Sequence, residues 1–314
     1  MHEINVRSLL AVHDKRNILR AKKIFFTGVD GEEVYNITSP FRSAGHEYIA
    51  GRVEPREKEL ESKIIFFIKK GDKWVPDKNA PVFNLQDPFI STINDELIFG
   101  GVEIIIDNGM VNYLTAFFRG KDVYHLKRFA EGPPGMKDIR LILLPQGEIG
   151  LFTRPQGIIG GRGRIGFMKI PSLLSLTQFK KEDYFKAPLL LDNLPDEEWL
   201  GPNVIYILKN GAIGVLGHIA CYTRGIKKKL NKNYYITTFV LDQHTNTSAG
   251  MKIILERNNL PQGQSKLKTL KNVLIPGGLV RHDDGTATMY IGASDAESYE
   301  IEMIDPFLEY ELEK

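Results

Sequence analysis

The chain has a single cysteine among its 314 residues, Cys221. One cysteine excludes an intramolecular disulfide. Cys221 lies in the apolar run Gly217-His218-Ile219-Ala220-Cys221-Tyr222, where a buried structural thiol is expected; a nucleophile would need an accessible, electropositive setting. His218 lies three residues earlier and would face the opposite side of a strand. We therefore expect an inert thiol.

Long apolar runs and an excess of charge are also missing. No stretch approaches the roughly 18 to 20 apolar residues needed to cross a bilayer, and residues 1–20 lack the continuous apolar segment of a secretory signal. We expect no membrane partner and a cytoplasmic location. The formal net charge of +2 gives no electrostatic reason to expect nucleic acid as a partner.

Motifs for metal and acyl-enzyme chemistry are absent. The seven histidines show no His-x-x-x-His spacing, and there is no cysteine cluster. The Gly-x-Ser-x-Gly nucleophile elbow is missing too. The sequence therefore predicts no metal site and no serine-based acyl transfer.

Strand-like segments fill the chain. Runs rich in β-branched and aromatic residues, such as 63–68 and 234–241, alternate with turn signals such as Asp283-Asp284-Gly285. Only 173–176 and the surface around Pro195–Trp199 suggest short helices. No Pro- or Ser-rich linker divides the chain, so residues 1–314 are predicted to form one all-β domain.

One phrase returns about every 60 residues, as in a repeat architecture. A short strand ends in a polar residue, and a second apolar run with Gly or Arg follows. The five copies run from Asn36 to Arg52, from Asp87 to Gly101, from Asp138 to Arg154, from Asn203 to His218, and from Gly277 to Asp295. Five such units predict a five-bladed β-propeller, in which the innermost strand of each blade delivers a polar residue to one axial pocket. We expect Asn36, Arg52, Asp87, Lys137, Asp138, Arg154, His218 and Asp295 to converge there.

Two other segments bear on this architecture. The strands at 22–27 and 300–304 are candidates to close the ring, since a propeller usually pairs its first strand with its last blade. Residues 157–166 carry five glycines with Arg162 and Arg164. A Gly-rich phosphate cradle is conceivable, but no strong helix pattern or P-loop lysine follows, so a mobile loop over the pocket is favoured.

Three residues stand out for chemistry. Asp87 precedes Pro88, which is expected to hold it extended and to present its carboxyl from an inner strand; a turn aspartate is the alternative. Arg154 ends an apolar strand, and His218 ends the equivalent strand one unit later. A lone histidine there is commonly structural, but two donor-rich residues at matched positions favour a shared anion.

The ordered phrases resemble a known family. The chain is similar to glycoside hydrolase family 130 mannoside phosphorylases, and more closely to the β-1,2-mannosyltransferases and mannoside phosphorylases of glycosyltransferase family 108, formerly domain of unknown function 1861. The resemblance covers nearly the whole chain. It lies in Tyr35-Asn36-Ile37 with Gly51-Arg52-Val53, Gln86-Asp87-Pro88, Lys137-Asp138, Arg154-Pro155, Gly217-His218 and Tyr290-Ile291-Gly292-Ala293-Ser294-Asp295. Gln86, Phe89 and Thr153 depart from the family's phrases.

The resemblance implies an inverting enzyme that moves mannose between a β-1,2-oligomannoside and phosphate. Mannose 1-phosphate is the implied donor in synthesis, with GDP-mannose as a further candidate. Asp87 would be the general acid, and inorganic phosphate, as co-substrate, would replace the second carboxylate of a hydrolase, with no cofactor. The implied phosphate ligands are Arg154 and His218, with Lys137 or Arg140. The implied mannose ligands are Asn36, Arg52, Asp138 and Asp295.

Some alternatives remain open. Trp199 or Tyr206 would either stack on a sugar or pack in the core. A β-mannoside hydrolase would need a carboxylate base to activate water, and Arg154 and His218 argue against it. A non-catalytic carbohydrate-binding propeller is a further alternative, because fold alone does not set function.

Overall fold

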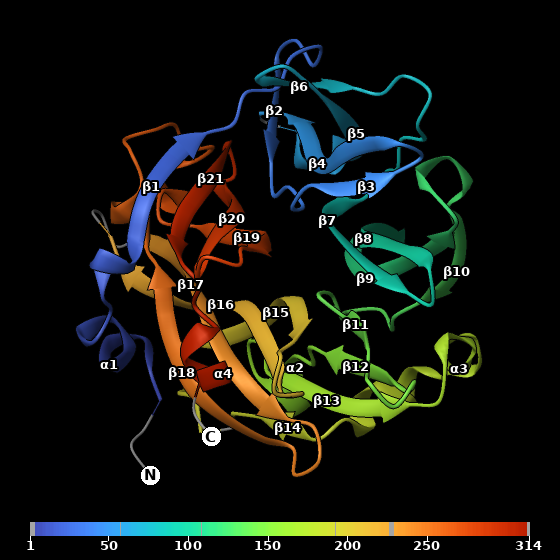
Figure 1. The fold of residues 1–314 in the computed structure, drawn as a ribbon, viewed down its shortest axis with the longest axis vertical. Helices are drawn as coiled ribbons and strands as arrows, with labels where there is room; N and C mark the ends of the chain where they lie inside the picture. Colours follow the sequence, from blue (N-terminus) through green and yellow to red (C-terminus); the bar gives the residue numbers. More distant parts are fainter. Residues whose placement is uncertain (1–3, 57, 108, 192, 226–228, 313–314) are drawn as a thin grey trace.

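The computed structural model describes residues 4–56, 58–107, 109–191, 193–225 and 229–312. Its strands form five antiparallel sheets arranged in a ring, as Figure 1 shows, with one end strand of each sheet toward the centre. This arrangement is a five-bladed β-propeller, so the predicted fold class is confirmed.

The blades follow one another along the chain. Blade 1 contains β2 (Glu32–Tyr35), β3 (Phe41–Ser43), β4 (His46–Pro55), β5 (Lys63–Lys70) and β6 (Lys73–Pro76). Blade 2 contains β7 (Gln86–Ile93), β8 (Glu96–Asp107), β9 (Met110–Gly120) and β10 (Lys127–Glu131). Blade 3 contains β11 (Arg140–Leu143), β12 (Ile149–Thr153), β13 (Ile165–Ile170) and β14 (Leu189–Leu190). Blade 4 contains β15 (Trp199–Ile207), β16 (Ile213–Arg224), β17 (Leu230–Asp242) and β18 (Thr247–Leu255).

Blade 5 joins the two ends of the chain. It contains β19 (Leu274–Arg281), β20 (Thr286–Ala293), β21 (Glu297–Ile304) and the N-terminal β1 (Ile18–Lys23). Lys22 pairs with Glu300, and Ala21 with Ile301. Closure therefore uses the predicted partners, but β1 begins earlier and ends at Lys23. The repeat favours five blades of four strands each, and this expectation is wrong for blade 1, which has a fifth strand: the short β3 pairs with β4.

The repeated phrase has a structural meaning. Its two halves are cross-strand neighbours: Tyr35 pairs with Arg52, and Gly201 pairs with His218. In the five blades the phrase joins the innermost strand to the second strand. Hairpin turns follow the glycine signals; Gly211, for example, has a φ of 82°, a value that suits glycine.

The core is divided among the contacts between blades. Five clusters of buried apolar side chains lie one at each blade–blade interface. Between blades 1 and 2, for example, Phe66 lies 5.2 Å from Phe99, ring centre to ring centre. Burial of these faces holds the blades around the axis, since the hydrophobic effect is the main favourable term in folding.

Helices are few and short. They are α1 (Val6–Ala11), α2 (Gly157–Gly160), α3 (Leu173–Gln178) and α4 (Leu308–Leu312). The helix expected near 173–176 is present as α3. The helix suggested around Pro195–Trp199 is wrong, because those residues turn into the start of β15. In the described part of the chain, no helix is long and apolar enough to cross a membrane. The cytoplasmic location stays a prediction.

Candidate active site

The inner strands surround a pocket of about 130 Å³ on the axis. Its walls include every sequence-predicted site residue except Arg140: Asn36, Arg52, Asp87, Lys137, Asp138, Arg154, His218 and Asp295. Glu59, Gln86, Asn203, Lys232, Tyr234, Leu270, Val273 and Ile275 complete it. The fold therefore brings together residues from all five blades, as the repeat predicted.

The backbone is unusual where it presents the axial side chains. Asn36, Asp87, Asp138 and Asp295 have φ values of 47°, 51°, 62° and 50°. Asn and Asp tolerate this left-handed region better than other non-glycine residues. The expectation that Pro88 would hold Asp87 extended is wrong. Asp87 lies where the pairing of β7 with β8 shifts register between Gln86 and Phe89, and such bulges re-aim a side chain.

Asp87 is held by two neighbours. Its Oδ1 accepts a 2.7 Å hydrogen bond from Nδ2 of Asn36 and lies 3.1 Å from Nη1 of Arg52. Burial alone would raise the pKa of Asp87, but the charges of Arg52 and Lys137 and the Asn36 bond outweigh it and hold the pKa below its usual value. The carboxyl is therefore ionised at neutral pH, although one fifth of its side chain remains exposed.

Arg154 is fixed from one side only. Its Nε donates to the carbonyl of Leu200 at 2.6 Å, and Nη1 lies 3.4 Å from Asp138 Oδ2. A Cβ at Gly163 would come within 2.7 Å of Nη2, so the guanidinium fits only against a bare backbone there. Nη1 is buried and makes no hydrogen bond to any described residue. Asp138 lies beside Arg154 and Lys137, whose charges outweigh burial and keep its pKa low.

His218 lies beside Arg154 as a neutral ring. Burial, followed by the charge of Arg154, lowers its pKa to about 3. Nδ1 lies 2.8 Å from Asn203 Oδ1, a contact in which Nδ1 carries the hydrogen and donates it. Nε2 is then an acceptor. The ring also packs against Tyr234, with centroids 5.1 Å apart.

The two other proposed phosphate ligands differ. Lys137 lines the pocket, and the charges of Asp138 and Asp87 raise its pKa despite burial. Arg140 instead lines a smaller neighbouring cavity with Asn36, Asp87 and Asn203. Its Nε donates to the Asn203 carbonyl at 2.6 Å, Nη1 donates to the Ile139 carbonyl at 3.0 Å, and burial lowers its pKa to about 10.

Asp295 behaves in the opposite way to Asp87. Burial raises its pKa to about 6; Arg52 opposes that shift, and the negative charge of Asp87 adds to it. The pocket therefore holds one carboxyl that gives up its proton readily and another that retains it into the mildly acidic range.

Sequence reasoning missed several residues here. Glu59, Lys232 and Tyr234 reach the pocket, and Lys266 touches its supporting network. Glu54 could have been found from its spacing, because it follows Arg52 by two positions on β4 and side chains two residues apart on a strand lie on the same face. Lys266 belongs to a long polar loop, where no local pattern indicates a partner. The two aromatic residues considered for stacking on a sugar do not line the pocket. Trp199 is 4% exposed, and the hydroxyl of Tyr206 accepts a hydrogen bond from the Leu279 amide.

A second cavity of about 290 Å³ adjoins the pocket. The two share Lys137, Arg154 and Tyr234. The remaining wall consists of Tyr113, Gln156, Arg162, Trp199 and Tyr222. The guanidinium of Arg162 lies 5.2 Å from the centre of the Tyr222 ring. Gln156 and Arg162 flank α2, so the glycine-rich segment borders this cavity. Arg164 is turned away and bonds the carbonyls of Leu194, Pro195 and Glu198.

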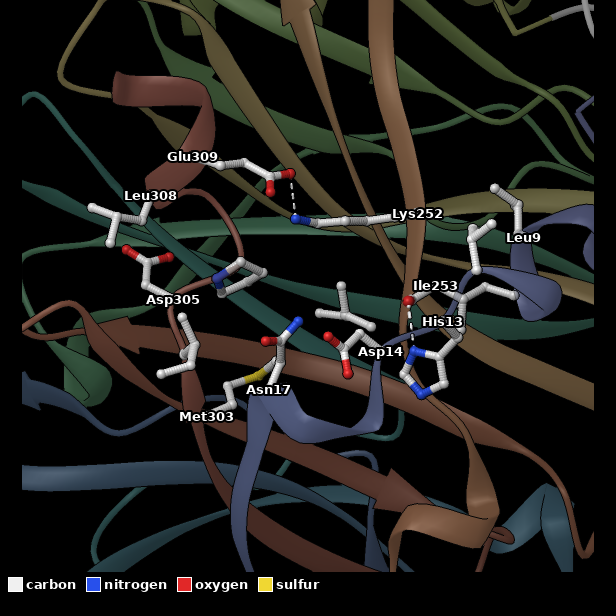
Figure 2. Close-up of a pocket in the computed structure, with 14 residues that line it drawn as sticks. Leu9, His13, Asp14, Asn17, Lys252, Ile253, Met303, Asp305, Leu308 and Glu309 are labelled. Atoms are coloured by element: carbon white, nitrogen blue, oxygen red, sulfur yellow. Dashed lines mark hydrogen bonds and ion pairs between the residues drawn. The ribbon is translucent and has the colours of Figure 1, made fainter. Parts of the chain in front are cut away.

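A larger cavity of about 440 Å³ lies elsewhere, between the N-terminal segment, β18 and the end of β21. Figure 2 shows two contacts between residues that line it: Lys252 with Glu309, and His13 with the Ile253 carbonyl. It contains no residue of the axial set.

The remaining expectations concern metals and the thiol. Across the described ranges, no three His, Cys, Asp or Glu side chains are placed to hold a metal ion. A reaction without metal or cofactor remains a prediction. Cys221 is partly buried, and burial raises the pKa of its thiol to about 11, so it is protonated at neutral pH.

The comparisons with known proteins agree with this geometry. The sequence pattern of DUF1861, described as a protein of unknown function, matches residues 11–309. The chain belongs to the DUF1861 family. No curated protein sequence matches it.

Solved structures add the chemistry of relatives. A mannose phosphorylase from Leishmania mexicana, in complex with a phosphate ion, is 33% identical, with 96% of this chain and 92% of that one covered and a TM-score of 0.86. A GDP-Man-dependent mannosyltransferase from the same organism is 31% identical, with 96% and 94% covered and a TM-score of 0.84. The chain is accordingly an enzyme of this mannosyltransferase and phosphorylase group.

A more distant structure shares the fold. The β-1,2-mannobiose phosphorylase of Listeria innocua, in complex with β-1,2-mannobiose, is 16% identical, with 90% of this chain and 93% of that one covered and a TM-score of 0.62. At this identity the likeness shows a common propeller only.

Proposed function

We propose that this enzyme is an inverting mannoside phosphorylase and β-1,2-mannosyltransferase. It would move mannose between a β-1,2-oligomannoside and inorganic phosphate, with mannose 1-phosphate as the donor in synthesis. The proposal makes Asp87 the general acid or base, and Arg154, His218 and Lys137 the phosphate ligands. Asn36, Arg52, Asp138 and Asp295 would bind mannose hydroxyls.

One observation carries the proposal. Among the described residues that line the pocket, two contain buried polar atoms without a hydrogen-bond partner: Nη1 of Arg154, a cationic donor, and Oδ1 of Asn36, a neutral acceptor. A buried guanidinium nitrogen that makes no hydrogen bond, and only a 3.4 Å ion pair with Asp138, has donor capacity left for an anion; an amide acceptor suits a hydroxyl. Asn36 also bonds Asp87, so the acceptor adjoins the proposed acid.

The protonation states support the synthetic direction. The acceptor hydroxyl oxygen forms its bond to C1 of mannose 1-phosphate, while the bond from C1 to the phosphate oxygen breaks. The hydroxyl proton passes to Asp87, directly or through a sugar hydroxyl, and phosphate leaves with the bonding electron pair. An ionised Asp87 is the form that this step requires. In phosphorolysis the same carboxyl returns the proton.

Phosphate is stabilised by charge and by a neutral ring. Arg154 and Lys137 offset the negative charge of phosphate on its approach to the sugar. Because the pKa of His218 is about 3, its imidazole remains neutral, and Nε2 accepts a hydrogen bond from a protonated phosphate oxygen. Arg140, whose donors face carbonyls, would act mainly through its charge.

A first test uses purified protein with mannose 1-phosphate and mannose. We expect phosphate release and a β-linked disaccharide, and reversal when phosphate is added in excess. Release of mannose from a mannoside without phosphate would favour the hydrolase. Binding of mannosides without turnover in either direction would favour a carbohydrate-binding propeller.

GDP-mannose is a second candidate donor, favoured by the cavity next to the pocket. This cavity shares Lys137 and Arg154 with the pocket, so it adjoins the proposed phosphate site. Arg162 and aromatic rings form the rest of its wall. These groups suit a second phosphate and a planar base. We expect GDP to compete with phosphate if this donor is used, and Arg162→Ala to abolish that competition. Unchanged phosphorolysis at high GDP would limit the donor to mannose 1-phosphate.

A further inference from the structure

Glu54 is a buried carboxylate outside the pocket that accepts hydrogen bonds from four side chains. Its side chain is 0% exposed. Oε2 accepts from Nε and Nη2 of Arg52 at 3.1 and 2.8 Å, and from the hydroxyl of Ser62. Oε1 accepts from the hydroxyl of Tyr35 at 2.6 Å and from Nζ of Lys266. A carboxylate removed from water needs such partners, because an unpaired buried charge is costly.

Arg52 binds the carboxylates of Glu54 and Asp87 with different parts of its guanidinium, and its Nη2 also lies 3.6 Å from Oε1 of the exposed Glu59. One edge, Nε and Nη2, faces Glu54, while Nη1 lies 3.1 Å from Oδ1 of Asp87. The guanidinium is planar and rigid, so fixing one edge fixes the direction of the other nitrogen. Glu54 therefore determines how Arg52 meets the proposed acid.

Lys266 reaches this cluster from the far end of the sequence. It lies in the segment between β18 and β19, and its side chain is only 8% exposed. Its amide donates to the Ser294 carbonyl at 3.0 Å, next to Asp295. One residue earlier, the Ser265 carbonyl accepts from Arg56 at 2.8 Å. The segment is thus attached to blades 1 and 5 beside the pocket.

The two cations share the two oxygens of Glu54. Without Lys266, the whole negative charge of Glu54 would act on Arg52 and draw its guanidinium away from Asp87. Lys266 contacts Oε1 of Glu54, whereas Arg52 contacts Oε2. Nζ of Lys266 also lies 3.9 Å from Oε2 of Glu59, whose Oε1 is 3.6 Å from Nη2 of Arg52. Lys266 therefore acts on Asp87 through the carboxylates that hold Arg52.

We propose that Lys266 and Glu54 are positioning residues that hold Arg52 against Asp87 and thereby set the protonation and aim of that carboxyl. This inference deepens the proposed function, since it rests on the proton-transfer role of Asp87. The segment that contains Lys266 also contributes Leu270 and Val273 to the pocket wall. The ion pair between Lys266 and Glu54 therefore links this part of the wall to the network that holds Asp87.

The first experiment compares Lys266→Met with Lys268→Met. Lys268 lies on the same segment and is exposed, so its substitution removes the same charge without touching Glu54. We expect Lys266→Met to lower kcat for phosphorolysis about tenfold or more with KM for phosphate within twofold, and Lys268→Met to leave both unchanged. Equal kinetics in the two variants would overturn the proposal.

A second experiment separates positioning from simple attachment of the segment. In the Asp87→Asn background, Lys266→Met should cause little further loss of kcat, because its effect passes through Asp87. Losses that multiply in the double variant would show that Lys266 only anchors the segment. If Lys266→Met does not fold, the double variant Lys266→Met/Glu54→Gln removes the charges of Lys266 and Glu54 together. It is then compared with Asp87 intact and in the Asp87→Asn background.

The final readout does not depend on turnover. Aspartate carboxyl carbons are labelled with ¹³C, and the Asp87 signal is assigned by its loss in Asp87→Asn. We expect Lys266→Met to raise the pKa of Asp87, while the other charged groups that act on it, Lys137, Arg140 and Asp295, are unchanged. An unchanged Asp87 titration would overturn the positioning role. A shifted titration in a protein that transfers no mannose would instead show that the proposed function is wrong.

Discussion

Asn36 and Asp87 occupy equivalent places on neighbouring blades, and Nδ2 of one donates a 2.7 Å hydrogen bond to Oδ1 of the other. Both residues have a left-handed backbone, so the contact joins two such backbone turns of adjacent blades. A neutral amide that donates to a carboxylate favours its ionised form. This pair therefore bears directly on the first prediction.

Asp87→Asn should lower turnover by roughly 10²-fold or more in both directions, within the range typical of general acid–base catalysis. The amide keeps the shape but cannot exchange a proton. The loss should shrink for aryl mannosides, whose leaving groups need less protonation. Thermal melting is the control, because a purely structural Asp87 would lower stability and activity together. Near wild-type turnover in either direction would contradict the assignment.

Arg154→Ala should raise KM for phosphate by about 10- to 100-fold, the cost expected for the loss of a charge-assisted hydrogen bond. Mannose binding, measured by calorimetry, should change little. Arg154→Lys is the matched variant: it keeps the charge but loses the bond to the Leu200 carbonyl, and we expect an intermediate KM. If both variants bind phosphate as the wild type does, the anion site lies elsewhere.

Asp295 should affect stability as a function of pH. Its folded pKa of about 6 lies above its ordinary value of 3.8, so the folded state retains a proton that the unfolded state has lost. The contribution of Asp295 to the free energy of unfolding should therefore fall as pH rises from about 4 to 6, by about 3 kcal/mol at most. Asp295→Asn should lack this fall. Urea unfolding of both proteins at pH 4 and pH 7 measures the difference, and parallel behaviour would contradict the raised pKa.

His218 should remain neutral from pH 8 down to pH 5. Its folded pKa of about 3 lies below the ordinary value of 6.5, so the unfolded state takes up a proton first as pH falls. The stability associated with the neutral ring is present above pH 6.5 and is lost between about pH 6.5 and 3. Imidazole ¹⁵N shifts, assigned with His218→Gln, should show Nδ1 protonated and Nε2 unprotonated throughout. A titration near pH 6 would contradict the lowered pKa of His218.

The sequence predicted the parts of the site that lie on regular strands. Tyr35 opposite Arg52 and Gly201 opposite His218 are local hairpin neighbours, so each blade leaves a readable phrase in the chain. The order of these phrases gave the fold and the axial set. The family match confirms that resemblance.

Residues from loops and bulges were harder to foresee. At the bulge, Asp87 contacts Asn36 and Arg52 of the neighbouring blade, and these tertiary contacts override the local preference imposed by Pro88. Lys266 meets Glu54 only because the ring brings blades 5 and 1 together. Arg140 matched the expected composition of an anion site, yet tertiary packing directs its donors to the carbonyls of Ile139 and Asn203.

The pairing of β1 with β21 has a consequence for synthesis on the ribosome. Lys23 lies in the first strand of the fold, whereas its partner Tyr299 lies in the last strand and emerges only after all four other blades have been translated. Blade 5 therefore cannot be finished during translation of the first four blades, and the ring stays open until β21 has been made. Such distant pairing slows folding. Until β21 has emerged, β1 lacks its partner and β20 exposes a free edge to which another chain could pair.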